Sequence, residues 1–115
     1  MPHATITNAL IRCIRSDREP AASFELVRED IGLWVLELDP GPGATLSEQI
    51  AEIYRQLRMR STELQNLREG SLDYALHLTF DLSDTVPIIL PTALSDLASD
   101  CGFEFEIYVN SIKEG

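Results

Sequence analysis

The side chains with the greatest capacity for chemistry lie in the second half of the chain, around one histidine. His77 follows Asp73 by four positions and precedes Asp81 by four, and Glu104 and Glu106 belong to a later segment with a similar alternating pattern. A histidine beside several carboxylates can act as a general base or form a weak metal site. A zinc site would require three or four ligands, usually with a dedicated histidine or cysteine pair, and no such pair is visible. We therefore expect no metal and no cofactor, and we favour the simpler interpretation of a polar strand face.

The motifs of the common enzyme classes are missing from the sequence. It contains no P-loop, no dinucleotide-binding glycine fingerprint, no nucleophile elbow and no H-E-x-x-H metal motif. The two cysteines, Cys13 and Cys101, form no C-x-x-C pair. Cys101 falls near the carboxyl end of a predicted helix, where no helix amino terminus can lower the pKa of a thiol. We expect both cysteines to be structural, and we predict that the chain is not an enzyme and has no catalytic residues.

Two predicted strands would position the side chains around His77. In Asp73–Leu82 every second residue is apolar, a pattern typical of a strand with one buried face. Phe103–Asn110 alternates in the same way. If the two strands lie side by side, their polar faces form one acidic, partly aromatic surface on which a cationic partner could dock. This predicted binding surface consists of Asp73, His77, Asp81, Glu104, Glu106 and Tyr108.

Capping signals and apolar stripes predict three helices. A capping box at Thr45–Glu48 precedes an apolar stripe, so we expect a helix over residues 45–59. Thr62 is a second capping candidate and would begin a shorter helix. A third helix is expected from Thr92 to Gly102, because glycine commonly ends a helix in the left-handed conformation.

The remaining segments predict further strands and one ambiguous element. Residues 23–28 and 33–38 have the composition of two strands joined by a tight connection. The first segment, up to Ile14, is rich in threonine and isoleucine, which suits a strand. The apolar positions from Ile6 to Ile14 follow helical spacing, however, and we favour a helix. Residues 86–90 contain a proline and are expected to form an edge strand or an extended connector.

Together these elements predict one α+β domain over residues 1–115. We expect a two-layer sandwich in which a mainly antiparallel sheet of four to five strands carries helices packed on one face. A chain of 115 residues with 44% hydrophobic residues can bury a core without disulfide or metal support. No apolar run approaches the roughly 18 residues needed to span a bilayer, and the start lacks the pattern of a secretory signal. We therefore expect a soluble cytoplasmic protein without membrane association.

The acidic charge narrows the choice of partner. The formal net charge is −10, and residues 69–115 contain nine acidic residues and one lysine. Such a field repels phosphate backbones, so we expect no nucleic-acid binding. It would attract a basic protein or another cationic ligand, although acidity also serves to keep a domain in solution.

Part of the chain resembles a known family. The matching features are a Gly-Leu-Trp strand at 32–37, an apolar helix stripe at 46–64, and a helix–strand pair that includes Leu97-Ala98, Gly102-Phe103 and Ile107-Tyr108. With these features residues 32–110 resemble the bacterial domain-of-unknown-function family DUF4279. The resemblance implies an α+β sandwich and a bacterial source, and it implies no activity, because the family itself has none assigned.

Three functional hypotheses follow. The first, which we favour, is a non-enzymatic interaction domain that masks a basic protein by charge complementarity, as an immunity protein masks a toxin. The second is a small enzyme that uses His77 with neighbouring carboxylates. The third is a structural module that forms a homodimer through sheet edges or exposed faces.

Overall fold

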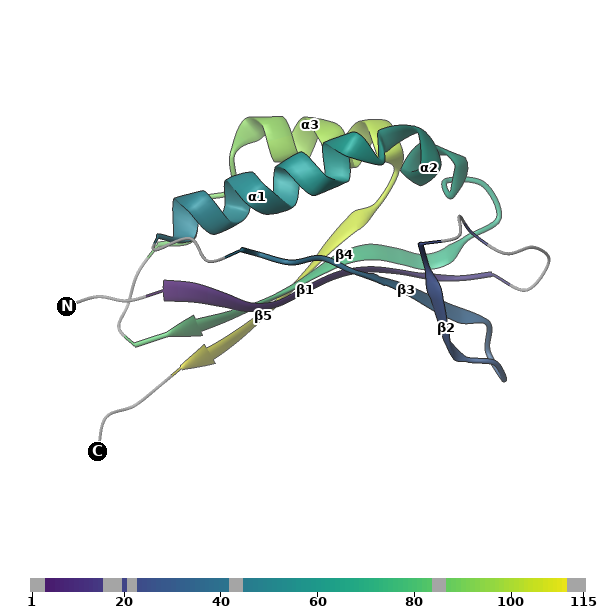
Figure 1. Cartoon of the computed structure of the whole chain (residues 1–115), viewed down its shortest axis with the longest axis horizontal. Coiled ribbons are helices and arrows are strands. Elements are labelled where there is room, and N and C mark those ends of the chain that lie inside the picture. Colours follow the sequence, from purple (N-terminus) through teal and green to yellow (C-terminus); the bar gives the residue numbers. More distant parts are fainter. Residues whose placement is uncertain (1–3, 16–19, 21–22, 42–44, 84–86, 112–115) are drawn as a thin grey trace.

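Five strands and three helices make up the described part of the chain, and the helices pack on one face of a single sheet (Figure 1). The computed structural model describes residues 4–15, 20, 23–41, 45–83 and 87–111. In chain order the elements are β1 (Ala4–Ile14), β2 (Glu25–Arg28), β3 (Leu33–Glu37), α1 (Leu46–Met59), α2 (Ser61–Asn66), β4 (Leu72–Leu82), α3 (Thr92–Cys101) and β5 (Glu104–Ser111). The predicted α+β fold, with a mainly antiparallel sheet and helices on one face, is confirmed.

The strand order is β2-β3-β1-β4-β5, and only the last pair is parallel. The two longest strands, β1 and β4, lie side by side near the centre and run antiparallel. Between β4 and β5 the chain crosses over through α3, as a parallel pair requires. β2 and β5 are therefore the two edges of the sheet. All the described helices lie on one face, and we call the other the open face (Figure 1).

The hydrophobic core lies between the sheet and the helix layer. Its fully buried side chains come from the two central strands and from all three helices. The largest of them are Ile11, Leu76, Leu78, Phe80, Ile53, Leu57, Leu64 and Leu94. The alternation predicted for Asp73–Leu82 is confirmed, because Tyr74, Leu76, Leu78 and Phe80 point into this core.

The first segment is a strand, and the helix expected there was wrong. β1 pairs with β3 on one side and with β4 on the other. Its register with β4 shifts between Ile6 and Asn8, and this bulge inserts one extra residue. Ile6 and Ala9, three positions apart, are consequently both buried, after which Ile11 and Cys13 follow at the ordinary spacing of two. The irregular spacing imitates a helical period, which explains why the pattern favoured a helix.

A side chain of α1 secures this bulge. Gln49 is buried, and its Oε1 accepts a hydrogen bond from the Ile6 amide at 2.8 Å and another from the Thr5 hydroxyl at 3.2 Å. Its Nε2 donates to the Ile6 carbonyl oxygen at 3.3 Å. The Gln49 side chain therefore satisfies backbone groups that the distorted ladder exposes, and it ties the helix layer to the central strand.

The helix boundaries agree with the capping signals at two of three sites. The Thr45 hydroxyl accepts a hydrogen bond from the Glu48 amide at 3.2 Å, which confirms the cap of α1. Gly102 ends α3 in the left-handed conformation, at φ 82°. At α2 the expectation was wrong, because the helix begins at Ser61 and Thr62 lies inside it without capping it.

The structure also tests the predictions for the segment after β4 and for the last strand. Residues 87–90 are a connector without strand pairing, which decides between the two alternatives for that segment, and Val86 lies outside the described residues. In the segment predicted as the last strand, Phe103, which directly precedes β5, is buried and Phe105 is partly buried, but Ile107 and Val109 are exposed. The helix layer covers Phe80 of β4 and leaves its direct neighbour Val109 uncovered.

None of the described helices is long and apolar enough to cross a membrane.

Candidate binding surface on the open sheet face

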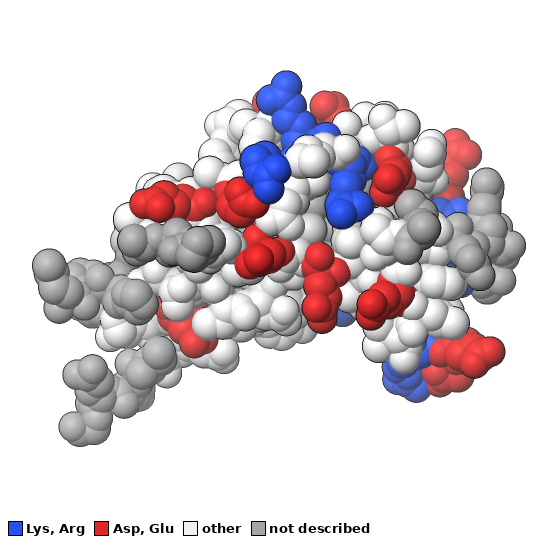
Figure 2. Space-filling model, in the orientation of Figure 1, with Lys and Arg blue, Asp and Glu red and all other residues white. Residues whose placement is uncertain are grey.

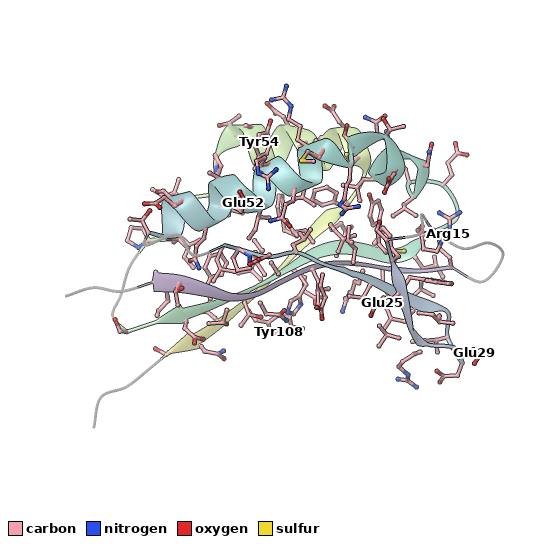
Figure 3. The ribbon with its side chains drawn as sticks, viewed as in Figure 1. Arg15, Glu25, Glu29, Glu52, Tyr54 and Tyr108 are labelled. Atoms are coloured by element: carbon pink, nitrogen blue, oxygen red, sulfur yellow. The ribbon has the colours of Figure 1, made fainter. Side chains whose placement is uncertain are left out.

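The register of β4 and β5 determines which polar side chains meet on the open face. His77 lies directly opposite Glu106, and Thr79 lies opposite Tyr108. Because directly paired residues point to the same face of a sheet, these four side chains form one cluster. Figure 3 shows the Tyr108 side chain on the side of the sheet away from the helices. The strand adjacency on which the predicted surface depends is therefore confirmed.

His77 is held by partners on both ring nitrogens. Its Nδ1 is hydrogen-bonded to Glu106 Oε1 at 2.9 Å, and its Nε2 is hydrogen-bonded to the Thr79 hydroxyl at 3.0 Å. The imidazole also packs against the ring of Tyr108, with centroids 4.9 Å apart. The His77 side chain is only 18% exposed, so the ring has a defined orientation on the face.

Arg12 of β1 completes the cluster. Its guanidinium pairs with the second carboxylate oxygen of Glu106, so Glu106 contacts a histidine and an arginine at once. The charge of Glu106 is consequently balanced within the fold, and this part of the face is less acidic than its sequence suggests. Sequence reasoning missed Arg12 because β1 was expected to be helical; the alternation of Leu10, Arg12 and Ile14 with the buried residues was the signal that could have revealed it.

The other predicted site residues lie apart from His77. Asp81 lies four residues beyond His77 along β4, and its Oδ1 accepts a hydrogen bond from the side-chain Nδ2 of Asn110 at 3.1 Å. Glu104 is exposed at the start of β5, opposite Ala75. Asp73 is exposed and adopts a positive φ of 47° where the β1–β4 register shifts, so it belongs to a bulge. Of the six predicted residues, the structure brings His77, Glu106 and Tyr108 into contact.

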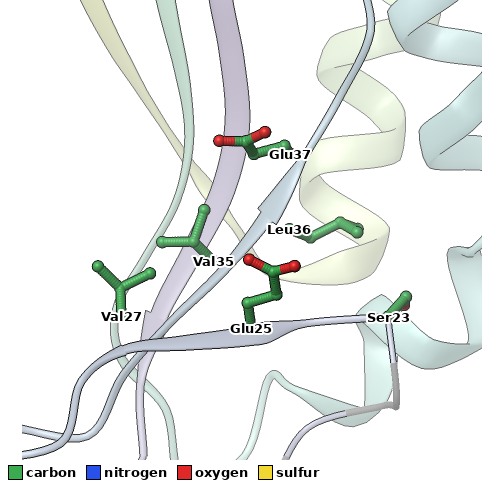
Figure 4. A pocket seen from close by; sticks show the side chains of 6 residues that line it. All are labelled: Ser23, Glu25, Val27, Val35, Leu36 and Glu37. Carbon is green, nitrogen blue, oxygen red and sulfur yellow. The ribbon is translucent and has the colours of Figure 1, made fainter.

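A second feature of the open face was not predicted. A hollow of about 230 Å³ lies where β2 meets β3, lined by Ser23, Glu25, Val27, Val35, Leu36 and Glu37 (Figure 4). Glu25 pairs directly with Val35, and Glu37 lies two residues further along β3, so both carboxylates share the face with Val35. Neither glutamate forms an ion pair within the described part of the chain, and both are exposed, so both charges face solvent. The hollow therefore combines the valine side chains of Val27 and Val35 with two carboxylates that no described cation neutralises.

Basic and acidic side chains are distributed differently between the helix layer and the sheet. Figure 2 shows arginine side chains mainly over the helix layer, with acidic side chains below them along the sheet. Intrahelical pairing accounts for some of the basic residues, because Arg55 donates to Glu52 three positions earlier. A cationic partner would consequently meet less repulsion at the sheet than at the helices.

The buried ionisable groups show no sign of reactivity. Burial raises the pKa of the Cys13 thiol and of the Cys101 thiol, and both are free cysteines inside the core. Burial also raises the pKa of Tyr74, whose hydroxyl donates to the Leu64 carbonyl oxygen at 2.7 Å. A thiol held in its neutral form is a poor nucleophile, so neither cysteine is suited to catalysis.

Within the described ranges, no three histidine, cysteine or carboxylate side chains are grouped in a way that could hold a metal ion.

The comparisons with known proteins give no match. No protein-family model matches the chain, and no match was found among curated proteins or solved structures. The functional argument therefore depends on the geometry of the open face.

Proposed function

We propose that this chain is a non-enzymatic interaction domain that binds a basic protein segment on its open sheet face. The observation that carries the proposal is the hollow between β2 and β3, which Glu25 and Glu37 line together with Val27 and Val35. The net charge of −10 supports it, because a long-range negative field speeds the encounter with a basic partner. The residues predicted from the sequence, around His77 and Tyr108, form the neighbouring part of the same face.

The hollow suits a lysine or arginine side chain of the partner. The methylene stem of such a side chain can lie along Val27 and Val35 while its charged head reaches Glu25 or Glu37. Tyr108 adds an aromatic group on the same face, and tyrosine is enriched in the buried centre of protein interfaces. The face thus offers both apolar contact and charge, as recognition of a basic segment requires.

The biological form of the proposal is a protein that masks a basic partner, as immunity proteins mask toxins. We place it in the cytoplasm, which is supported by two free, buried cysteines that require no oxidising compartment.

A synthetic ten-lysine peptide tests the proposal without knowledge of the natural partner. We expect the peptide to bind at low salt and to bind roughly 5- to 30-fold more weakly to the double variant Glu25→Gln/Glu37→Gln, since two exposed ion pairs are each worth up to about 1 kcal/mol. The matched control is Asp96→Asn/Asp100→Asn, which removes the same charge from exposed positions of α3. Equal losses in both double variants would mean that net charge alone drives binding, and the proposed face would be rejected.

One observation favours a second candidate, the small enzyme based on His77. A carboxylate on Nδ1 and a hydroxyl on Nε2 is the arrangement by which a histidine is oriented as a base toward a nucleophile, here Thr79. The test is hydrolysis of a simple activated ester, p-nitrophenyl acetate, by the wild type and by His77→Gln. Equal rates in the two proteins would eliminate this candidate.

A further inference from the structure

The two edges of the sheet differ in how they are protected against pairing with another strand. β2 has only four residues, its register with β3 shifts between Leu26 and Arg28, and a charged turn follows it. Short, irregular and charged edges resist the addition of a strand. β5 has eight residues, and it pairs with β4 from Glu104 to Ser111 without a register shift. Its outer edge pairs with no other strand of the described part of the chain, so β5 presents a long and regular edge.

The outer half of β5 is uncovered on both faces. Ile107 and Val109 point to the helix side and Tyr108 to the open side, yet all three are exposed, Tyr108 to 52% and Val109 to 50%. Among the described elements β4 is the only one that β5 contacts extensively. Exposed β-branched and aromatic residues on a regular edge strand are the features that favour strand addition.

We propose that β5 pairs antiparallel with β5 of a second copy of this chain, with the two-fold axis at Tyr108. In this register Ile107 lies opposite Val109 of the partner, and Val109 lies opposite its Ile107, so the four exposed apolar side chains cover one another on the helix side. Glu106 lies opposite Asn110, a neutral residue. Closed two-fold contacts of this kind are the commonest form of self-association.

Charge disfavours the registers that bring the glutamates of β5 close together, whereas an axis at Tyr108 keeps them apart and still sets Ile107 opposite Val109. A parallel pairing in register would set the glutamates of β5 beside one another, and an antiparallel pairing centred on Glu106 would place two carboxylates directly opposite. An antiparallel pairing with its two-fold axis at Ile107 would make the Glu106 residues of the two copies diagonal neighbours, roughly 7–8 Å apart. A centre at Tyr108 separates them by four residues, or about 13 Å along the strands. That spacing exceeds the Debye length of about 8 Å at physiological salt, so their repulsion is largely screened.

The dimer would form one continuous sheet with five strands from each copy, and the helices of both copies would lie on the same side. The open faces would join into one surface with an acidic hollow near each end, because β2 and β3 lie at the edge opposite to β5. The proposal does not depend on the basic partner, since it follows from the edge geometry alone.

Sedimentation equilibrium over about 1 µM to about 1 mM protein tests the interface. We expect reversible dimerisation by the wild type, loss of the dimer in Val109→Lys, and an unchanged dimer in Val27→Lys. Val27 is a matched control, because it is exposed to 57% on the opposite edge strand. A wild type that remains monomeric at the highest concentration, or a dimer that Val27→Lys abolishes and Val109→Lys preserves, would overturn the proposal. The dimer should also tighten as salt rises, whereas binding of the lysine peptide should weaken, so the failure of one proposal is distinguishable from the failure of the other.

Cysteine crosslinking tests the register. In Tyr108→Cys the two new thiols would lie directly opposite across the axis, within reach of a disulfide. The oxidant diamide should therefore produce a covalent dimer that a reducing agent reverses, and Val27→Cys should produce none. The native Cys13 and Cys101 are buried and leave the assay undisturbed. Crosslinking of Val27→Cys without crosslinking of Tyr108→Cys would contradict an axis on β5.

Discussion

Replacing Gln49 by leucine should be among the most destabilising single changes in α1, although glutamine is polar and lies on a helix. Gln49 is only 6% exposed, and its side chain bonds both the amide and the carbonyl of Ile6 at the bulge of β1. Leucine fits the volume and the apolar surroundings. It leaves the buried Ile6 amide without its partner, so the loss comes from unsatisfied backbone groups and not from a cavity.

The magnitude follows from the three hydrogen bonds. An unsatisfied buried donor costs about 1–3 kcal/mol, and the weaker bonds to the Ile6 carbonyl and the Thr5 hydroxyl add about 0.5–1 kcal/mol together. We expect a loss of about 1.5–4 kcal/mol in the free energy of unfolding for Gln49→Leu. With a urea m-value of about 1.5 kcal/mol/M, the unfolding midpoint would fall by about 1–2.7 M.

Urea unfolding followed by the fluorescence of Trp34 measures this loss, and Gln65→Leu is the matched control. Gln65 is an exposed glutamine in α2, so its replacement should change the free energy of unfolding by about 0.5 kcal/mol or less. Hydrogen exchange of the Ile6 amide provides a local readout and should accelerate in Gln49→Leu more than global unfolding requires. Equal midpoints for Gln49→Leu and Gln65→Leu would refute the role assigned to Gln49.

Three further predictions concern the glycines with positive φ, the buried tyrosine and thiols, and the ion pair between Arg12 and Glu106. Gly32→Ala should destabilise the protein by about 2–4 kcal/mol and Gly102→Ala by about 1–2 kcal/mol in thermal unfolding. Both glycines have a positive φ, but a Cβ at Gly32 would lie 2.3 Å from a backbone oxygen, whereas a Cβ at Gly102 would meet a flexible side chain. Equal losses in the two variants would contradict this reasoning. Burial raises the pKa of Tyr74 and of the two thiols above their ordinary values of 10.0 and 9.0, so the unfolded chain ionises first and the free energy of unfolding should fall as pH rises above about 9. Tyr74→Phe should flatten that fall above pH 10, and a wild type equally stable at pH 8 and pH 11 would be inconsistent with these burials. Glu106→Gln should cost about 1 kcal/mol through the partly exposed pair with Arg12, and a double-mutant cycle with Arg12→Met that yields no coupling energy would show that the pair contributes nothing.

Much of the fold could be predicted from the sequence because its signals are local. The cap at Thr45, the terminating Gly102 and the alternation along Asp73–Leu82 each depend on residues within a few positions of one another, and each is found in the structure. Hydrogen bonding within one turn and the two-residue period of a strand act at that range, so the pattern alone determines them. The predicted binding surface assumed that β4 and β5 are neighbours, and the structure shows this adjacency, which alternation suggests but cannot establish.

Tertiary structure decided the rest, for reasons that act at long range. β1 is a strand because β3 and β4 provide hydrogen-bonding partners for its backbone on both sides. Gln49 stabilises the bulge that gives the apolar residues of β1 a helix-like spacing. Because β1 is a strand beside β4, Arg12 forms an ion pair with Glu106, more than ninety positions away. This pair neutralises part of a sheet face that the composition alone predicts to be acidic. The sequence determined which side chains of β4 and β5 would alternate between the two faces of the sheet. Only the packing of the strands decided which charged side chains would form ion pairs and which strands would become the edges of the sheet.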